Sequence, residues 1–155
     1  HARRAAAMSV TDDLLNGHAT LIAGAGLGVF NPSGVYASSD LAIYLKIMPD
    51  APDRCIVLNW IPLTDEVNIP EGTGLLQIAA RGDRNDPIDV DNILDPIFGL
   101  LQNRTGYTLG TTTVDQCLRV GAVPMGQDSL VRFERADKYT LTVAQTPTTL
   151  RPYSG

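Results

Sequence analysis

The sequence predicts an α+β fold, because two helical patterns are interspersed with several strand patterns. Apolar residues recur at spacings of three and four in residues 9–25 and again in residues 86–101, as on one face of a helix. Elsewhere they form short apolar runs or alternate with polar residues, which is typical of strands. The longest alternating region, residues 111–143, predicts a long two-stranded ribbon.

The length of 155 residues favours a single domain with a sizeable core. We expect this domain to span residues 9–146, between an N-terminal extension (1–8) and a C-terminal tail (147–155). Met8 is interpreted as the natural start, with the residues before it an upstream extension; a genuine N-terminal arm is the alternative. The extension is basic but lacks the apolar core of a signal peptide.

The first helix has a capping residue, an apolar stripe and a glycine-rich end. Ser9 with Asp12, or Thr11 alone, can cap its first N–H groups. The stripe contains Leu14, Leu15, His18, Leu21, Ile22 and Ala25. His18 is expected to be a half-buried side chain with satisfied hydrogen bonds, not a base or a ligand. The helix is expected to end in residues 24–28, where three glycines favour termination.

Strands are expected between the two helices. They are predicted at residues 29–30, 41–47, 55–60 and 75–81, with a turn at 31–34 and a polar loop at 64–74. The last of these strands is apolar on both faces, which is typical of a central strand.

The second helix is predicted to begin with Asp86 as its N-cap and Pro87 at its first position. Its stripe contains Val90, Ile93, Leu94, Ile97 and Leu101. Pro96 removes a helical donor, so a kink or a break is expected near Asn92–Pro96.

The remaining chain predicts a turn at 103–106, a strand at 111–120, an irregular bend at 121–128 and a final strand. Residues of one parity in that final strand are expected to face the core: Val131, Phe133, Tyr139, Leu141 and Val143.

Composition and charge exclude several kinds of function. The net charge of −5 is unsuited to gripping a phosphate backbone, which needs clustered Lys and Arg. No apolar run approaches the ~20 residues of a membrane span. Cys55 and Cys117 lack metal-type spacing and are expected to be reduced, buried groups of a protein that folds in the cytoplasm.

No catalytic or cofactor motif emerges, and no cofactor or dedicated metal site is expected. The acidic cluster contains Asp83, Asp86, Asp89, Asp91 and Asp95. An EF-hand loop starting at Asp83 needs glycine at its sixth position, where this chain has Ile88. The glycines at 24–28 follow a helix, whereas a nucleotide-binding loop follows a strand.

A series of short motifs carries a family resemblance. In the second half these are Arg81-Gly82, Asp86-Pro87, Val90-Asp91, Gly126-Gln127-Asp128, Arg132, Glu134-Arg135, Asp137 and Tyr139. The first half adds Gly26-Leu27-Gly28-Val29-Phe30 with Pro32, and the turn Pro52-Asp53-Arg54. In this order and spacing, residues 9–143 resemble the bacteriophage minor capsid or tail-terminator family of long-tailed phages. Lys138, where the pattern has asparagine, and Pro96 depart from it.

The resemblance implies a fold and a function. The fold is a small α+β domain in which helices pack on one face of a mainly antiparallel sheet. The function is structural and non-enzymatic: a ring, commonly hexameric, at the head-proximal end of the tail tube, which stops tube polymerisation and joins tail to head. The implied partners are further copies of the chain, the major tail tube protein and a head-completion protein, without a membrane. DNA would pass through the lumen without specific binding, in a virion neck assembled in the cytoplasm of the bacterial host.

Charged and polar residues in and beside the second-half strands are the candidates for subunit or partner contacts. They are Arg81, Gln127, Asp128, Arg132, Arg135 and Asp137; for each, a solvent-facing side chain is the alternative. Two other functions are weighed: a head-completion or connector ring of the neck, and a metal-dependent hydrolase that uses Asp83, Asp86 and Asp89.

Overall fold

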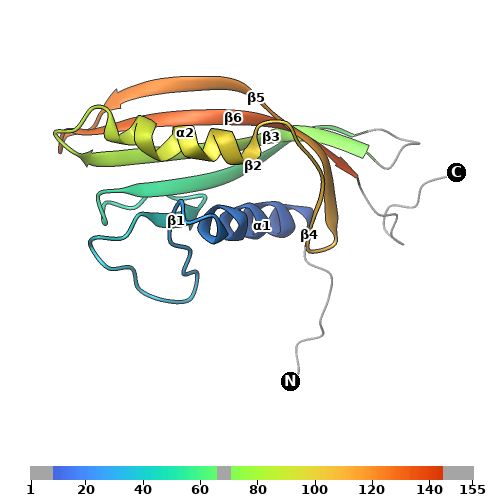
Figure 1. Cartoon of the computed structure of the whole chain (residues 1–155), viewed down its shortest axis with the longest axis horizontal. Helices are drawn as coiled ribbons and strands as arrows, with labels where there is room; N and C mark the ends of the chain where they lie inside the picture. Colours follow the sequence, from blue (N-terminus) through green and yellow to red (C-terminus); the bar gives the residue numbers. More distant parts are fainter. Residues whose placement is uncertain (1–8, 66–70, 145–155) are drawn as a thin grey trace, which may run out of the picture.

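The protein folds as a curled six-stranded sheet with two helices, as the sequence predicts (Figure 1). The computed structural model describes residues 9–65 and 71–144. The elements are α1 (Val10–Gly24), β1 (Ala42–Leu45), β2 (Cys55–Asp65), β3 (Glu71–Arg84), α2 (Asp89–Leu101), β4 (Arg104–Leu109), β5 (Thr112–Gln127) and β6 (Arg132–Ala144). The strand order is β1-β2-β3-β6-β5-β4, with β1 parallel to β2 and the other named pairs antiparallel.

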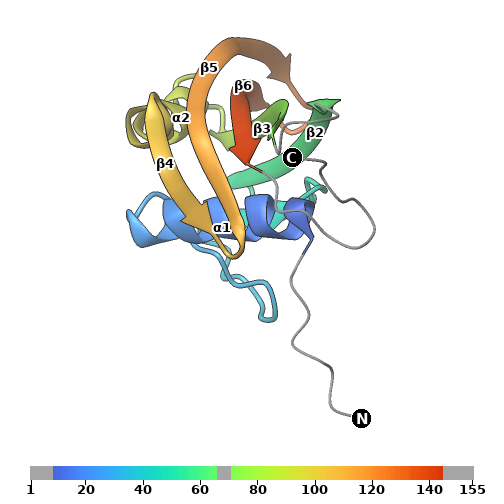
Figure 2. The same cartoon turned by 90° about the vertical axis from the view of Figure 1, so that its right-hand side faces the viewer.

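Both helices pack into one core on one face of the sheet. Alternate residues of the central strand β3, among them Leu76 and Ile78, are fully buried beneath them. The second helix, α2, runs along β3 and β6, whereas the sheet curls so that β4 lies beside α1 (Figures 1 and 2). Gly17 permits this approach, because a Cβ at that position would lie 2.6 Å from the Cβ of Leu109 on β4.

The start of α1 agrees with the prediction, and the position of its histidine is corrected. The N–H of Asp12 donates to the Ser9 hydroxyl at 3.0 Å, as an N-cap requires. His18 is fully buried, not half-buried, because β4 covers it. Its Nδ1–H donates to the Leu14 carbonyl at 2.7 Å, and the Tyr107 hydroxyl donates to its Nε2 at 2.8 Å, so its hydrogen bonds are satisfied as expected.

The second helix begins later than predicted and is not interrupted. It starts at Asp89, while the Asp86 carboxylate accepts from the N–H groups of Ile88 and Asp89 at 3.2 Å each. The helix continues through Pro96 to Leu101, so the expected break does not occur. Pro96 lies on the exposed side.

Tertiary pairing extends two strands into the polar loop predicted at 64–74. The ladder of β2 and β3 continues to the pair of Asp65 with Gly72, past a register shift between Pro62 and Thr64. Turn-forming residues there indicated a loop, but pairing across the hairpin overrides that local preference.

The ribbon after α2 contains one strand more than predicted. Three residues of the turn predicted at 103–106 belong to β4, which begins at Arg104 and pairs with residues 112–117 of β5. The bend predicted at 121–128 is instead, up to Gln127, the second half of β5, which stays paired with β6 through register shifts at Arg119/Gly121 and Pro124/Gly126. Bulges of this kind let a strand absorb extra residues and remain in its ladder.

The final strand follows the predicted alternation except at its start. Tyr139, Leu141 and Val143 are buried, and Phe133 is partly buried against the core. Val131 is exposed instead, because it precedes β6 in the turn from β5 and has a φ of 58°.

Both cysteines are free and buried, and burial raises the pKa of each thiol to about 11. In residues 9–65 and 71–144, no helix has the length and apolar character needed to cross a membrane. The predicted extension at 1–8 and tail at 147–155 lie outside the described residues.

Candidate assembly surfaces

The turn that precedes β2, residues 50–54, is clamped by arginines from the neighbouring strands. The buried guanidinium of Arg81 donates to the carbonyls of Pro52 and Asp53 at 2.8 Å each. Arg132, also buried, donates to the Asp50 carbonyl at 2.6 Å and to the Asp53 carboxylate at 2.9 Å. The turn is therefore fixed to β3 and β6.

Further ion pairs connect this turn to the rest of the fold. Burial opposes ionisation of Asp53, but hydrogen bonds from Arg84 and Arg132 outweigh it and lower the carboxyl pKa. On the other side, Arg54 makes two hydrogen bonds to Asp89, at 2.8 and 3.0 Å. Because Asp89 is the first residue of α2, the turn also fixes the start of that helix.

Asp128 shapes the turn between β5 and β6. Its carboxylate accepts from the N–H groups of Leu130 and Arg132 at 3.0 Å each, and from the Arg132 side chain at 2.9 and 2.8 Å. The hydrogen bond from the Arg132 side chain is the main cause that lowers the pKa of Asp128 to about 2.

A second cluster lies beneath α2. Arg135 pairs with the fully buried Asp137 through two hydrogen bonds of 2.8 and 2.9 Å. The third nitrogen of the same guanidinium contacts Asp91 at 3.0 Å and Asp95 at 2.9 Å, both on α2. Burial opposes the charge on Arg135, yet these carboxylates outweigh it and raise the pKa of Arg135 above its ordinary value. Arg119 adds a contact to Asp137 at 3.5 Å.

The structure separates the six residues predicted as contact candidates into three groups. Arg81 and Arg132 lie together at the 50–54 turn, and Arg135 and Asp137 lie together beneath α2; the charged groups of all four are engaged within the subunit. Asp128 is half-buried in its turn, and Gln127 is exposed. A role for any of the six in subunit contacts stays a prediction. Asp91 and Asp95, which contact Arg135, are about 40 residues away from it in sequence, and no sequence pattern connects them with it.

The acidic residues considered for a hydrolase do not converge. Asp89 is paired with Arg54 and also accepts from the N–H of Asp83 at 2.7 Å, whereas Asp86 caps the turn before the helix. Over the described parts of the chain, no group of three or more His, Cys, Asp and Glu side chains is arranged to hold a metal.

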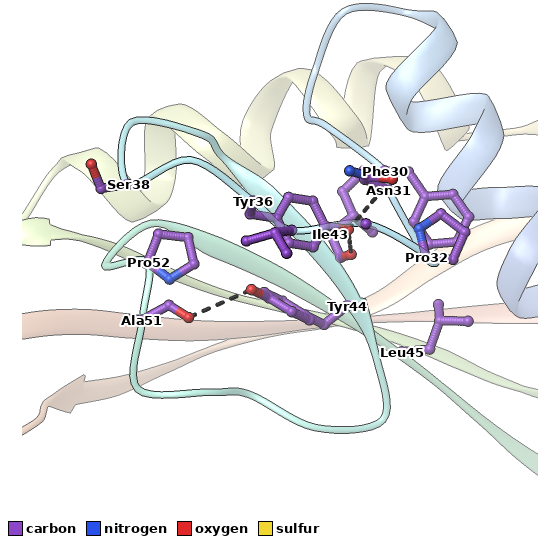
Figure 3. Close-up of a pocket in the computed structure, with 12 residues that line it drawn as sticks. Phe30, Asn31, Pro32, Tyr36, Ser38, Ile43, Tyr44, Leu45, Ala51 and Pro52 are labelled. Atoms are coloured by element: carbon purple, nitrogen blue, oxygen red, sulfur yellow. Dashed lines mark hydrogen bonds between the residues drawn. The ribbon is translucent and has the colours of Figure 1, made fainter.

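An open apolar groove lies along the outer side of β1 (Figure 3). Its volume is about 610 Å³, and its walls are residues 30–38, β1 itself and the Ala51–Pro52 segment. Tyr36 and Tyr44 pack together in it, with ring centroids 4.9 Å apart. The Tyr36 hydroxyl donates to the Ile43 carbonyl at 2.6 Å, which holds the loop against the strand. None of the lining residues is charged.

An exposed apolar segment lies at the opposite edge of the sheet. We call residues 120–127, the second half of β5, the β5 arm. Among the described residues, β4 pairs with β5 only as far as Cys117, so no strand covers the outer edge of the arm. Val120, Val123 and Met125 are 61%, 48% and 60% exposed. The arm contains no charged residue.

Comparisons with known proteins point to one class of particle. The sequence profile of the family described as "Bacteriophage tail terminator protein" matches residues 21–145. No curated protein matches the chain. Among solved structures, a chain of the virion of a native gene transfer agent particle is similar in fold, with a TM-score of 0.62 and 10% sequence identity over 84% of this chain and 94% of that one.

Proposed function

The chain belongs to the bacteriophage tail terminator family and is thus a structural tail protein of a virion, and we propose how it acts there. In this proposal it forms a ring, commonly hexameric in the family it resembles, at the head-proximal end of the tail tube. The ring stops the addition of tube subunits and joins the tail to the head.

The observation that carries the proposal is the family match, which extends from the last turn of α1 to the end of β6. The fold shared with a chain of a virion supports it independently of sequence. The uncharged groove and β5 arm add support, because a protein that works by assembly needs exposed apolar surface for its neighbours.

The partners follow from that position. We propose contacts with further copies of the chain, with the major tail tube protein on one side and with a head-completion protein on the other. DNA passes through the lumen without specific binding, which agrees with a net charge of −5. The protein acts without catalysis, in the neck of a particle assembled in the bacterial cytoplasm.

The test is electron microscopy of particles produced with a nonsense mutation in this gene. The expected result is overlong tubes of variable length that are not attached to filled heads. Wild-type protein supplied in trans is the control and should restore uniform, attached tails. Tails of uniform length beside separate heads would instead identify a head-completion or connector protein, and normal infectious particles would contradict both functions.

A further inference from the structure

We propose that neighbouring subunits of the ring contact each other head to tail, with the β5 arm of one copy packed in the groove beside β1 of the next. The inference rests on the proposed function in requiring a ring, and it adds the surfaces that form it. The proposed occupant of the groove is the β5 arm of a second copy of this chain. Both surfaces lie in residues that the structure describes.

The register of the sheet places the two surfaces at the same height on opposite edges. One row of paired residues runs from Tyr44 on β1 through Val57, Ala79 and Ala136 to Val123 on the arm. The next row runs from Leu45 through Leu58, Ile78 and Asp137 to Ala122. The groove strand and the arm therefore occupy the same rows.

This equal height is what a closed ring requires. A head-to-tail contact between different surfaces closes into a ring if repeated rotation returns to the start, and gives a helical filament if each step also rises. Because Tyr44 and Val123 share a row, the arm of one copy can face the groove of the next without a shift along the strands. The two side chains also lie on the same face of the sheet, opposite the helices, since directly paired residues point the same way.

The chemistry of the two surfaces is matched. The arm exposes Val120, Val123 and Met125, and the groove has aromatic and aliphatic walls that include the 92% exposed Val35. Neither surface has a charged residue, so burying one against the other leaves no ion unpaired. Methionine is unbranched and flexible, which suits an apolar hollow.

Two further features indicate that the contact is made by apolar side chains and not by pairing of strands or by attraction between charges. Pro124 in the arm cannot donate a backbone hydrogen bond, and proline on an exposed edge limits indiscriminate strand pairing. Each copy has a net charge of −5, so long-range electrostatics opposes association. The apolar contact must therefore supply the attraction.

The test is chemical cross-linking in assembled particles that carry Val35→Cys and Val123→Cys in the same chain. A short, flexible bismaleimide should give a ladder of covalent multimers of this chain on a denaturing gel. A cross-link within one subunit leaves the chain a monomer on the gel, so it does not imitate the expected ladder. The native cysteines are buried, so wild-type particles control for background.

Each single variant is a matched control for the head-to-tail arrangement of the contact, and neither should form multimers. Dimers of the Val123→Cys variant alone would mean that arm meets arm, which overturns the head-to-tail contact. Infectious particles that contain the double variant and show no ladder would overturn the arm-in-groove contact and leave the terminator function intact. Absence of the wild-type chain from particles would contradict the proposed function itself.

Discussion

The 50–54 turn and the β5 arm reverse the usual distribution of residues between interior and surface. At the turn, charged side chains are directed inward: Arg81 and Arg132 are 3% and 2% exposed and fully engaged. In the arm, apolar side chains are directed outward, with Val120 and Met125 more than half exposed. Both regions lie at the same end of the sheet: the turn is held against the central strands β3 and β6, whereas, among the described residues, the arm has a free outer edge.

The turn stabilises the fold of the subunit, whereas the arm is available for contacts with other subunits. Buried ion pairs have a defined geometry, and removing one partner strongly destabilises the folded protein. They therefore fix the relative positions of the strands and the helix. Exposed apolar side chains contribute little to the isolated subunit, but gain free energy once a partner covers them. The comparison thus predicts opposite outcomes for substitutions in the two regions: loss of stability in one, and loss of assembly in the other.

Removal of the carboxylate beneath α2 should have the largest effect on stability. Asp137→Ala leaves the buried guanidinium of Arg135 without its bidentate partner, and removing one member of a buried pair costs about 3–5 kcal/mol. Urea unfolding of the purified subunit measures this as a lower midpoint at unchanged slope. Asp95→Asn is the control: its side chain is 67% exposed, so a loss below about 0.5 kcal/mol is expected. Equal losses in the free energy of unfolding for the two variants would contradict the prediction that burial makes the Arg135–Asp137 pair the more important one.

His18 extends the comparison to a buried group that is uncharged. Burial lowers the pKa of His18 from 6.5 to about 4, so the folded protein takes up the proton later than the unfolded chain as pH falls. The contribution of His18 is present above pH 6.5 and is lost between about pH 6.5 and 4, to a maximum of about 3 kcal/mol.

The measurement is the free energy of unfolding against pH for the wild type and for His18→Gln. The wild type should show the steeper decline between about pH 6.5 and 4, because glutamine takes up no proton. Parallel curves would mean that the histidine is protonated equally in both states. The absolute stability of the variant does not enter this comparison.

Two arginines that contact the same carboxylate show the role of burial within the turn. Arg132 and Arg84 each donate to Asp53 at 2.9 Å, but their side chains are 3% and 52% exposed. Arg132→Ala should cost about 1–3 kcal/mol, because it removes several charge-assisted hydrogen bonds. Arg84→Ala should cost about 0.5 kcal/mol or less. Thermal unfolding of both variants tests the ranking, and the reverse order would contradict it.

Much of the fold could be predicted from the sequence because the signals are local. The cap at Ser9 and the apolar stripes identify both helices, and the all-apolar run identifies β3 as a central strand. Turn-forming residues gave a wrong prediction elsewhere: Gly106 lies inside β4 and Gly110 directly follows it, both with positive φ, and these glycines obscured the strand. Strand β5 has three register shifts, and the two at Arg119/Gly121 and Pro124/Gly126 lie where the sequence indicated only an irregular bend.

The candidate surfaces could be predicted only in part. Arg135 and Asp137 have the same parity as Tyr139, so their place on the covered face of β6 was implicit in the alternation. Asp91 and Asp95, which contact Arg135, lie on a helix about 40 residues earlier in the chain. No local sequence pattern predicts such a contact. The shared rows of β1 and the arm depend on the register of five strands together, which is a property of the folded sheet.

Met125→Asp should have the smallest effect on the subunit, yet abolish assembly. Met125 is 60% exposed, so the change should alter the free energy of unfolding by no more than about 0.5 kcal/mol. In the groove of a neighbour, the new carboxylate would be desolvated against apolar walls without a cationic partner, which is strongly unfavourable. Particles made with this variant should therefore resemble those of the nonsense mutation in electron micrographs. Ile88→Asp, a change at a 58% exposed residue outside the groove lining and the arm, controls for added charge and should assemble normally. Normal tails with Met125→Asp would show that the arm remains in water.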